Sequence, residues 1–426
     1  MDSREPAWTI HSAPSASTSA DAARARLVTE LRFREGALSR SVQAAFARVP
    51  RHIFVPEVDA VAAYRDEALV IKCGPDGLPV SSSSQPAMMA IMLEQLCLRA
   101  GDRVLEIGTG SGYNAAVMAE VVGSTGQVVS IDIDPELAAR ARSSLLAAGY
   151  DDVTVLCADG GYGDPVGAPF DRIVVTAGAW DIAPAWLDQL GSGGRLVLPL
   201  SLRGIQLSVA LERAGAGWVS RSACRCGFVR MLGAFAGPER VLQLDEPEAM
   251  FVQMADGSPV DGLALRCALG GPAMTVPVAR DLAGVADVAD LDLWLTLTSP
   301  DLARLTILAA PGNWLPLEPL LPIGGLIGHA TDPGRIGIAV LLPGAAARDV
   351  PAGPVSAGIV LSGYGPGGAA IAASLAHLTA DWADGGRPGA QELELRVWPA
   401  SGEPRPVTPL AHVLQRPSVT IEATWR

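Results

Sequence analysis

Short apolar runs alternate with longer amphipathic segments over the first half of the chain. Five runs have the length and composition of buried strands: 104–107, 127–131, 153–157, 171–175 and 194–199. Helical patterns lie between them, at 113–122, 135–149 and 184–190. Two further runs, 205–212 and 218–222, flank a Gly-rich turn and predict a hairpin. This order predicts an α/β fold with a doubly wound, mostly parallel sheet and an antiparallel hairpin finish.

The segments before the first strand run predict helices around one extended stretch. Residues 1–20 are rich in Ser, Ala and Thr and are expected to form a disordered N-terminus. Two amphipathic helices are expected within 22–48, and the prolines that bracket 49–56 predict an extended segment. An apolar helix is expected at 87–98, with Pro86 in its first turn.

The pattern changes after about residue 237, where Gly, Pro, Ala and Leu dominate. Strand-like runs occur at 263–268, 291–298, 336–342, 356–362 and 393–398. One clear helix is expected at 369–382. The sequence therefore predicts a first domain at 21–238 and a C-terminal α+β domain at 239–426, and the second carries no catalytic motif.

Composition excludes several classes of protein. The net charge of −13 over 426 residues argues against a nucleic-acid-binding surface. The most apolar part, 305–342, is interrupted by prolines and glycines, so no membrane span is expected. The six cysteines have the spacing of neither a disulfide framework nor a zinc site, so we expect no metal and a reducing cytoplasm. Cys224 and Cys226 are interpreted as strand residues, with metal or redox chemistry as the alternative.

A glycine-rich turn follows the first strand run. Its residues are Gly108, Thr109, Gly110 and Gly112, and the glycines have the spacing G-x-G-x-G. Glycine allows positive φ and close approach of a ligand, and this context is typical of Rossmann-like nucleotide sites, although a simple tight turn is the alternative. Glu106, just before the turn, suits a ligand with a cationic end. We therefore expect S-adenosyl-L-methionine, whose α-amino group and sulfonium are both positive.

Acidic and polar residues follow the other strand runs. Asp132 and Ile133 end the second run, where an acid suits two ribose hydroxyls. Asp159 and Gly160 follow the third run, and an aspartate there can accept a hydrogen bond from the adenine amino group. Thr176 follows the fourth run. Because parallel strands end at one edge of a sheet, we expect these residues to form one cofactor-binding rim with the glycine turn.

A run of four serines, 81–84, precedes Gln85 and the apolar helix. Hydroxyl and amide groups at the start of a helix are suitable donors for orienting an acceptor group, and a flexible linker is the alternative. We expect Ser83, Ser84, Gln85 and Thr176 to orient the group that accepts the methyl group of S-adenosyl-L-methionine.

With these motifs the chain resembles the protein-L-isoaspartate O-methyltransferase family. The matching segments are VPRHIFVPE at 49–57, SQP at 84–86, VLEIGTGSGY at 104–113, GYDDVTV at 149–155, DG at 159–160, FDRIVVTA at 170–177 and GGRLVLP at 193–199. The resemblance covers about residues 25–235. It implies methyl transfer from S-adenosyl-L-methionine to a carboxylate of an aspartyl or isoaspartyl residue, leaving S-adenosyl-L-homocysteine. The ester would collapse to a succinimide that hydrolyses to Asp or isoAsp.

Two features depart from the family pattern. The family usually reads Thr-Ile-Ser-Gln-Pro where this chain has the serine run, and Ser84 takes the place of the family's active-site serine. The family is also typically half this length. Both features resemble a long branch encoded beside ribosomally made peptides such as lanthipeptides and graspetides, where a defined aspartate of a cyclised peptide is methylated. Residues 239–426 would then recognise the peptide substrate.

Two other functions stay open. A general repair enzyme would methylate isoaspartyl residues in many damaged proteins. A non-catalytic protein would bind S-adenosyl-L-methionine and use its C-terminal half as an interaction module. The acidic rim and Ser84 favour an enzyme over the last of these, with a peptide or protein as its partner.

Overall fold

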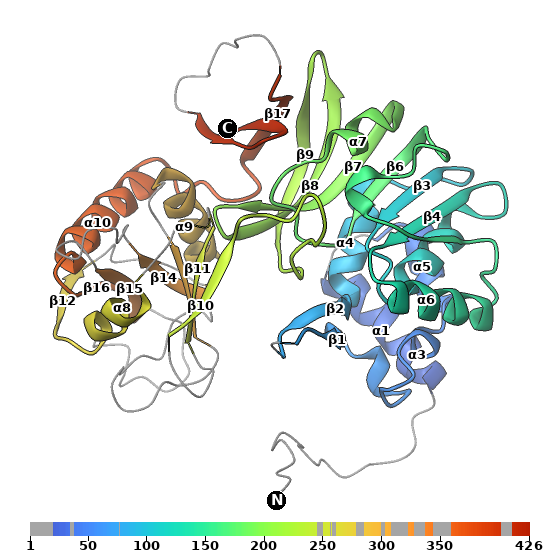
Figure 1. Ribbon diagram of the computed structural model, residues 1–426, viewed down its shortest axis with the longest axis horizontal. Helices are drawn as coiled ribbons and strands as arrows, with labels where there is room; N and C mark the ends of the chain where they lie inside the picture. Colours follow the sequence, from blue (N-terminus) through green and yellow to red (C-terminus); the bar gives the residue numbers. More distant parts are fainter. Residues whose placement is uncertain are drawn as a thin grey trace, which may run out of the picture.

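The computed structural model contains a ten-stranded sheet, a seven-stranded sheet and a small hairpin among its described residues (Figure 1). The described residues are 20–34, 38–75, 77–244, 250–255, 257, 261–277, 285–299, 303–307, 323–327, 337–343, 359–401 and 411–426. The segment predicted to be disordered lies outside them, apart from Ala20.

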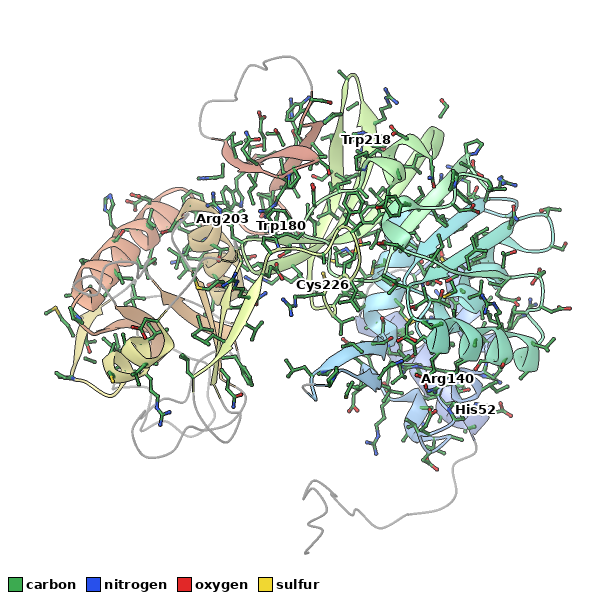
Figure 2. All side chains as sticks on the ribbon, viewed as in Figure 1. His52, Arg140, Trp180, Arg203, Trp218 and Cys226 are labelled. Carbon is green, nitrogen blue, oxygen red and sulfur yellow. The ribbon has the colours of Figure 1, made fainter. Side chains whose placement is uncertain are left out.

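The ten-stranded sheet has the order β18-β19-β17-β9-β8-β7-β6-β3-β4-β5. Its strands from the first half of the chain are β3 (Arg103–Ile107), β4 (Gln127–Asp132), β5 (Thr154–Cys157), β6 (Phe170–Val175), β7 (Leu190–Leu202), β8 (Ile205–Ala214) and β9 (Gly217–Cys226). The strands from β5 to β7 are parallel, and β8 and β9 continue as an antiparallel hairpin. The predicted doubly wound fold is confirmed, and Cys226 lies at the end of β9 (Figure 2).

Alternate residues of the central strands face two separate cores, as the period of a strand requires. Val104 packs into the core that contains α1 (Ala20–Arg34), α2 (Arg40–Arg48), α4 (Pro86–Leu96), α5 (Tyr113–Val122) and part of α6 (Pro135–Ala148). Leu105 packs into the core that contains α7 (Pro184–Asp188). Burial on both faces explains why these strands are continuous apolar runs.

The segment 49–56 was predicted to be extended, and this prediction is wrong. Residues Arg51–Phe54 form the short helix α3, and Pro50 occupies its N-cap. Proline is compatible with the start of a helix, so two bracketing prolines do not require an extended backbone. A short 3₁₀ turn at Ala62–Tyr64 then leads to the hairpin of β1 (Leu69–Cys73) and β2 (Pro79–Ser83).

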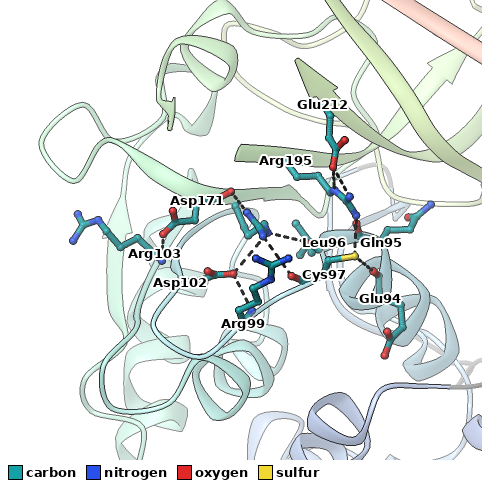
Figure 3. A network of polar contacts seen from close by, with 11 residues as sticks. Glu94, Gln95, Leu96, Cys97, Arg99, Asp102, Arg103, Asp171, Arg195 and Glu212 are labelled. Carbon is teal, nitrogen blue, oxygen red and sulfur yellow. Dashed lines mark hydrogen bonds and ion pairs between the residues drawn. The ribbon is translucent and has the colours of Figure 1, made fainter. Parts of the chain in front are cut away.

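The C-terminal end of α4 is held by arginines from the central sheet (Figure 3). Arg172 Nε donates to the carbonyl of Leu96 at 2.8 Å, and Arg195 Nη1 donates to that of Gln95 at 2.6 Å. Arg195 also pairs with Glu212 on β8. The last carbonyls of a helix lack intrahelical partners, so these cations fix the C-terminal end of α4, whose first turn follows the serine run.

The seven-stranded sheet has the order β10-β11-β13-β14-β15-β16-β12, and its described pairs are all antiparallel. Its strands are β10 (Arg240–Gln243), β11 (Met250–Met254), β12 (Ala273–Pro277), β13 (Ala303–Ile307), β14 (Ile323–Ile327), β15 (Ile338–Pro343) and β16 (Ile359–Tyr364). Its helices are α8 (Gly262–Leu269), α9 (Val285–Thr298) and α10 (Gly368–Asp384). Among the described helices of the chain, none is long and apolar enough to cross a membrane.

The strands predicted at 263–268 and 291–298 are wrong, since both segments lie in helices. A short apolar run does not distinguish a buried helix from a buried strand by its period. The helix predicted at 369–382 and the strands predicted at 336–342 and 393–398 are found with small shifts of their bounds.

The last three strands return to the first sheet. They are β17 (Leu393–Pro399), β18 (His412–Gln415) and β19 (Val419–Trp425). β17 pairs with β9 through Val397 and Trp218, and Ile421 is fully buried in the same core as α7. The second domain predicted at 239–426 therefore does not extend to the end of the chain, because its last strands complete the sheet of the first.

We expect Ile421→Ala to destabilise the first sheet, although residue 421 lies far outside the first half of the chain. Deleting a fully buried Ile side chain in this way costs about 2–5 kcal/mol of unfolding free energy. Urea denaturation, with hydrogen exchange of the β9 amides as a local reporter, measures the effect. Leu263→Ala, at a position 74% exposed on α8, is the control. Unchanged protection of β9 would show that β17–β19 do not support this sheet.

Candidate active site

A cavity opens at the carboxyl ends of β3, β4 and β6, the edge where a parallel sheet binds ligands. Counting its solvent-open mouth, it contains about 940 Å³ of space not filled by protein atoms. Its lining residues are 80–84, 89, 106–111, 113, 114, 131–134, 137, 160, 176, 177 and 229–232.

The glycine turn adopts a backbone that glycine favours. The φ angles of Gly108, Gly110 and Gly112 are +103°, +53° and +84°. A Cβ on Gly108 would lie 2.5 Å from Thr176 Oγ1, and the Thr176 hydroxyl donates to the Gly108 carbonyl at 2.6 Å. Thr176 thus lines the cavity, and its hydroxyl donates to the turn. Its role toward the acceptor stays a prediction.

Glu106 lies fully buried beneath the glycine turn. Asn114 Nδ2 donates to its Oε1 at 2.7 Å, and the Ser130 hydroxyl donates to its Oε2 at 2.5 Å. Ser130 is in turn 2.6 Å from Thr109 Oγ1, so the carboxyl group ties the turn to β4. Burial raises the pKa of Glu106 to about 7, against the two hydrogen bonds, which lower it. Glu106 lines the cavity, and each of its oxygens accepts one hydrogen bond and keeps a further lone pair.

Asp132 lies at the end of β4 beside the glycine turn. Its Oδ2 accepts from the Gly110 amide at 2.9 Å, and its Oδ1 accepts from the Asp134 amide at 3.0 Å. Burial raises the pKa of Asp132, and these two amides counter the shift. Ile133 and Asp134 also line the cavity, and Lys72 of β1 lies 2.7 Å from Asp134. The structure thus brings the predicted acid of the second strand into the cavity.

Asp159 is not among the residues that line the cavity, although Gly160 is. Its Oδ1 accepts from the Gly161 amide at 2.9 Å, and its Oδ2 accepts from the Ala234 amide at 2.7 Å. The predicted bond to an adenine amino group is therefore not supported by its position. Its carboxylate instead holds a turn and the segment after β9.

All four residues of the serine run line the cavity, and Ser81 and Ser83 are buried. Ser83 is 3% exposed, and its Oγ has no hydrogen-bond partner within the described residues. Ser84 also lines the cavity. Gln85 does not, because its amide nitrogen donates to the Asp66 carboxylate at 3.1 Å. The structure thus brings Ser83 and Ser84, but not Gln85, to the cavity, and their roles toward the acceptor stay predictions.

Arg51 fixes the backbone of the serine run. Its guanidinium is completely buried and donates to the carbonyls of Ala63, Arg65, Glu67, Ser83 and Ser84 at 3.0–3.4 Å. Burial lowers the pKa of Arg51, and nearby Tyr113 and Asp66 oppose that shift. A buried cation needs such partners, so carbonyls from two distant segments are drawn to one point. The VPRH motif therefore acts on the site through the position of its arginine.

The segment 229–232 forms a wall of the cavity that the sequence did not predict. The Gly178 amide donates to the Val229 carbonyl at 2.8 Å, and the Met231 amide donates to the Gly178 carbonyl at 3.0 Å. Arg230 is the one cationic side chain among the described lining residues. The apolar run after the hairpin, FVRML, was a signal for a further buried segment. Asn114 was also missed, and it is the residue that holds Glu106.

We expect the stability contributed by Glu106 to fall as the pH rises. Burial raises the pKa of Glu106 from the ordinary 4.5 to about 7, so between these pH values the folded state holds a proton that the unfolded state releases. Relative to Glu106→Gln, the free energy of unfolding should drop by about 1–3 kcal/mol between pH 4.5 and 7 and then level off. Urea denaturation at several pH values measures the difference. A difference independent of pH would mean that Glu106 is ionised throughout.

Comparison with known proteins agrees with this geometry. The family model described as protein-L-isoaspartate(D-aspartate) O-methyltransferase matches residues 22–234. Protein-L-isoaspartate O-methyltransferase 2 of Archaeoglobus fulgidus is 47% identical over 201 residues, which are 47% of this chain and 88% of the relative. The protein-L-isoaspartate O-methyltransferase of Ignicoccus hospitalis is 44% identical over 200 residues, 46% of this chain and 92% of the relative.

A solved structure described as protein-L-isoaspartate O-methyltransferase aligns with a TM-score of 0.49 and 23% identity, covering 88% of this chain and 96% of its own. The family assignment rests on the sequence matches, which span nearly the whole length of the relatives. The predicted enzyme class and cofactor are thereby confirmed. The chain belongs to the protein-L-isoaspartate O-methyltransferase family of S-adenosyl-L-methionine-dependent enzymes.

Proposed function

We propose that this chain methylates the carboxylate of an Asp or isoAsp residue in a peptide, with the donor bound at the glycine turn and the acceptor at the serine run. One observation carries the proposal. A single cavity joins the acids Glu106 and Asp132 to the buried Ser83 hydroxyl, which has no partner in the described part of the chain. The acids suit a cationic donor, and the hydroxyl suits an anionic acceptor.

The residues of the rim fit S-adenosyl-L-methionine. Positive φ at Gly108 and Gly110 keeps side chains out of the space beside the turn. Asp132 retains lone pairs for the ribose hydroxyls, since each oxygen accepts one backbone bond. Asp132 contributes negative charge at the rim, whereas Glu106 lies below the turn and Asp134 is paired with Lys72. When bound, the cofactor supplies an electrophilic methyl group on a positively charged sulfur.

The acceptor requires orientation more than activation. A carboxylate with an unperturbed pKa of about 4 is ionised at neutral pH and needs no general base. This agrees with the described lining residues, which include no His, Lys or Cys. Ser83 and Ser84 hold one carboxylate oxygen in line for transfer, and the surrounding walls exclude water. Arg51 keeps both serines in place through their carbonyls.

The methyl ester activates the modified residue toward its own backbone. The neighbouring amide nitrogen attacks the ester carbonyl, the C–N bond of a succinimide forms, and methanol leaves with the amide proton. Water then opens either C–N bond and yields Asp or isoAsp. These steps follow release of the methyl ester and require no residue of the chain.

A dedicated, cyclised peptide is the substrate that we propose within this class. The serine run differs from the family pattern, and the matched relatives correspond to less than half of this chain. The residues that follow the cavity wall lead within eight positions into β10 of the second sheet. A second unit attached at the cavity can hold a folded peptide, and contacts remote from the carboxylate then position it for transfer. General repair of isoaspartyl proteins is the alternative, and the names of the relatives state protein L-isoaspartate as the methylated group.

Replacing Ser83 by alanine should lower turnover while leaving cofactor affinity nearly constant. Loss of a hydrogen bond to a charged group costs about 1.5–3 kcal/mol, which corresponds to roughly a 10- to 100-fold loss in kcat/KM. Ser143→Ala on α6, where the hydroxyl bonds only to a backbone carbonyl, is the control. If turnover is unchanged in both Ser83→Ala and the quadruple alanine variant of 81–84, the serine run is only a linker.

Substrate choice is tested by direct competition. We expect the full chain to methylate an aspartate in the cyclised product of a precursor peptide from the same gene cluster more efficiently than an isoaspartyl hexapeptide. Labelled methyl groups and mass spectrometry measure both products, and the unmodified linear precursor is the control. Efficient methylation of the isoaspartyl peptide, with none of the cyclised one, would assign the chain to general repair.

A further inference from the structure

Polar residues meet around the buried Glu239 and Ser201 where the two sheets join, and we call this cluster the Glu239 junction. It consists of Glu239, Ser201, Gln253, Arg230 and Arg416. The Ser201 hydroxyl donates to Glu239 Oε1 at 2.5 Å, and Gln253 Nε2 donates to Oε2 at 3.3 Å. Arg230 Nη1 donates to the Glu239 carbonyl at 2.7 Å. One residue therefore connects β7, the second sheet and the cavity wall.

The junction also includes the strands that close the chain. Arg416, between β18 and β19, donates to the Ser201 carbonyl at 3.3 Å, and its guanidinium lies 4.1 Å from the centre of the Trp180 ring. Burial lowers the pKa of Arg416 to about 10, and the charges of Asp181 and Glu239 oppose the shift. Trp180 and Arg203 mark this region between the two units in Figure 2. The C-terminal strands thus place a cation beside Glu239.

Burial makes the geometry of this junction specific. Glu239 is 8% exposed and Ser201 is 2% exposed, so their polar atoms cannot exchange protein partners for water without cost. The carboxyl group is held from two sides, by β7 and by β11. A shift of the second sheet would therefore move Glu239, and with it the carbonyl that Arg230 contacts.

We propose that Glu239 is a positioning residue through which the second sheet sets the cavity wall 229–232 against the acceptor. The inference rests on the proposed function of the cavity. The wall and the serine run line the same cavity. Within the described residues, Val229 and Met231 bond to Gly178, and Arg230 bonds to the Glu239 carbonyl. Glu239, Gln253 and Arg416 all lie outside the residues that the family model matches, so this device belongs to the extended chain.

The test compares Glu239→Gln with Asp292→Asn in the full chain. Asp292 of α9 pairs with Arg225 of β9 at 2.8 Å, so it also links the two units, but through a strand outside the wall. We expect Glu239→Gln to lower kcat/KM for the peptide that the wild type methylates by about 10- to 100-fold, chiefly through KM. The Kd for S-adenosyl-L-homocysteine should stay within about twofold, because the cofactor rim is untouched. Asp292→Asn should change neither constant.

Hydrogen exchange of backbone amides tests the same junction in the absence of a substrate. The Met231 amide, bonded to Gly178, should exchange at least about tenfold faster in Glu239→Gln and at the wild-type rate in Asp292→Asn. Equal effects of the two variants, or an unchanged Met231 amide, would overturn the proposal. If Glu239→Gln does not fold, Gln253→Ala removes one anchor and must show the same pattern more weakly. If the wild-type chain methylates none of the peptides, the proposed function is refuted. The hydrogen-exchange comparison then still tests whether Glu239 positions the wall.

Discussion

The buried carboxyl group of Glu106 is the interaction on which the cofactor rim depends. It lies under the glycine turn, takes hydrogen bonds from Asn114 and Ser130, and through Ser130 reaches Thr109 of the turn. An acidic group without exposure is costly unless it is bonded, so the turn, α5 and β4 are held in one arrangement. Glu106 therefore supports the turn and also lines the cavity proposed for the donor.

The same logic of buried polar groups recurs around the cavity. Arg51 holds the serine run through backbone carbonyls, and Glu239 holds the wall after β9 through a carbonyl and two side chains. Arg51 and Glu239 do not line the cavity themselves, and each positions residues that do. The family part of the chain supplies the first two supports, Glu106 and Arg51, whereas the third comes from residues beyond 234. A carboxylate acceptor has to be oriented and shielded from water and does not need a base, so rigid cavity walls suit this reaction.

The sequence was informative where structure is local. Strand, turn and helix follow each other within thirty residues around Gly108, and the parallel order then places Asp132 and Thr176 at one edge. It was uninformative where partners are distant. Gln85 bonds to Asp66 and Asp159 bonds to Ala234, so neither is directed as its motif implied. The pairing of Val397 with Trp218 joins strands that local patterns cannot relate, and short apolar runs in α8 and α9 have no period that separates helix from strand.

The central claim is that donor and acceptor meet between the glycine turn and the serine run. A crystal structure of the full chain with S-adenosyl-L-homocysteine tests it most directly. The account predicts the ligand along Gly108 and Gly110, its ribose hydroxyls on Asp132, and its sulfur facing the Ser83 hydroxyl. A ligand bound with its sulfur turned away from the serine run, or outside this cavity, would contradict the account.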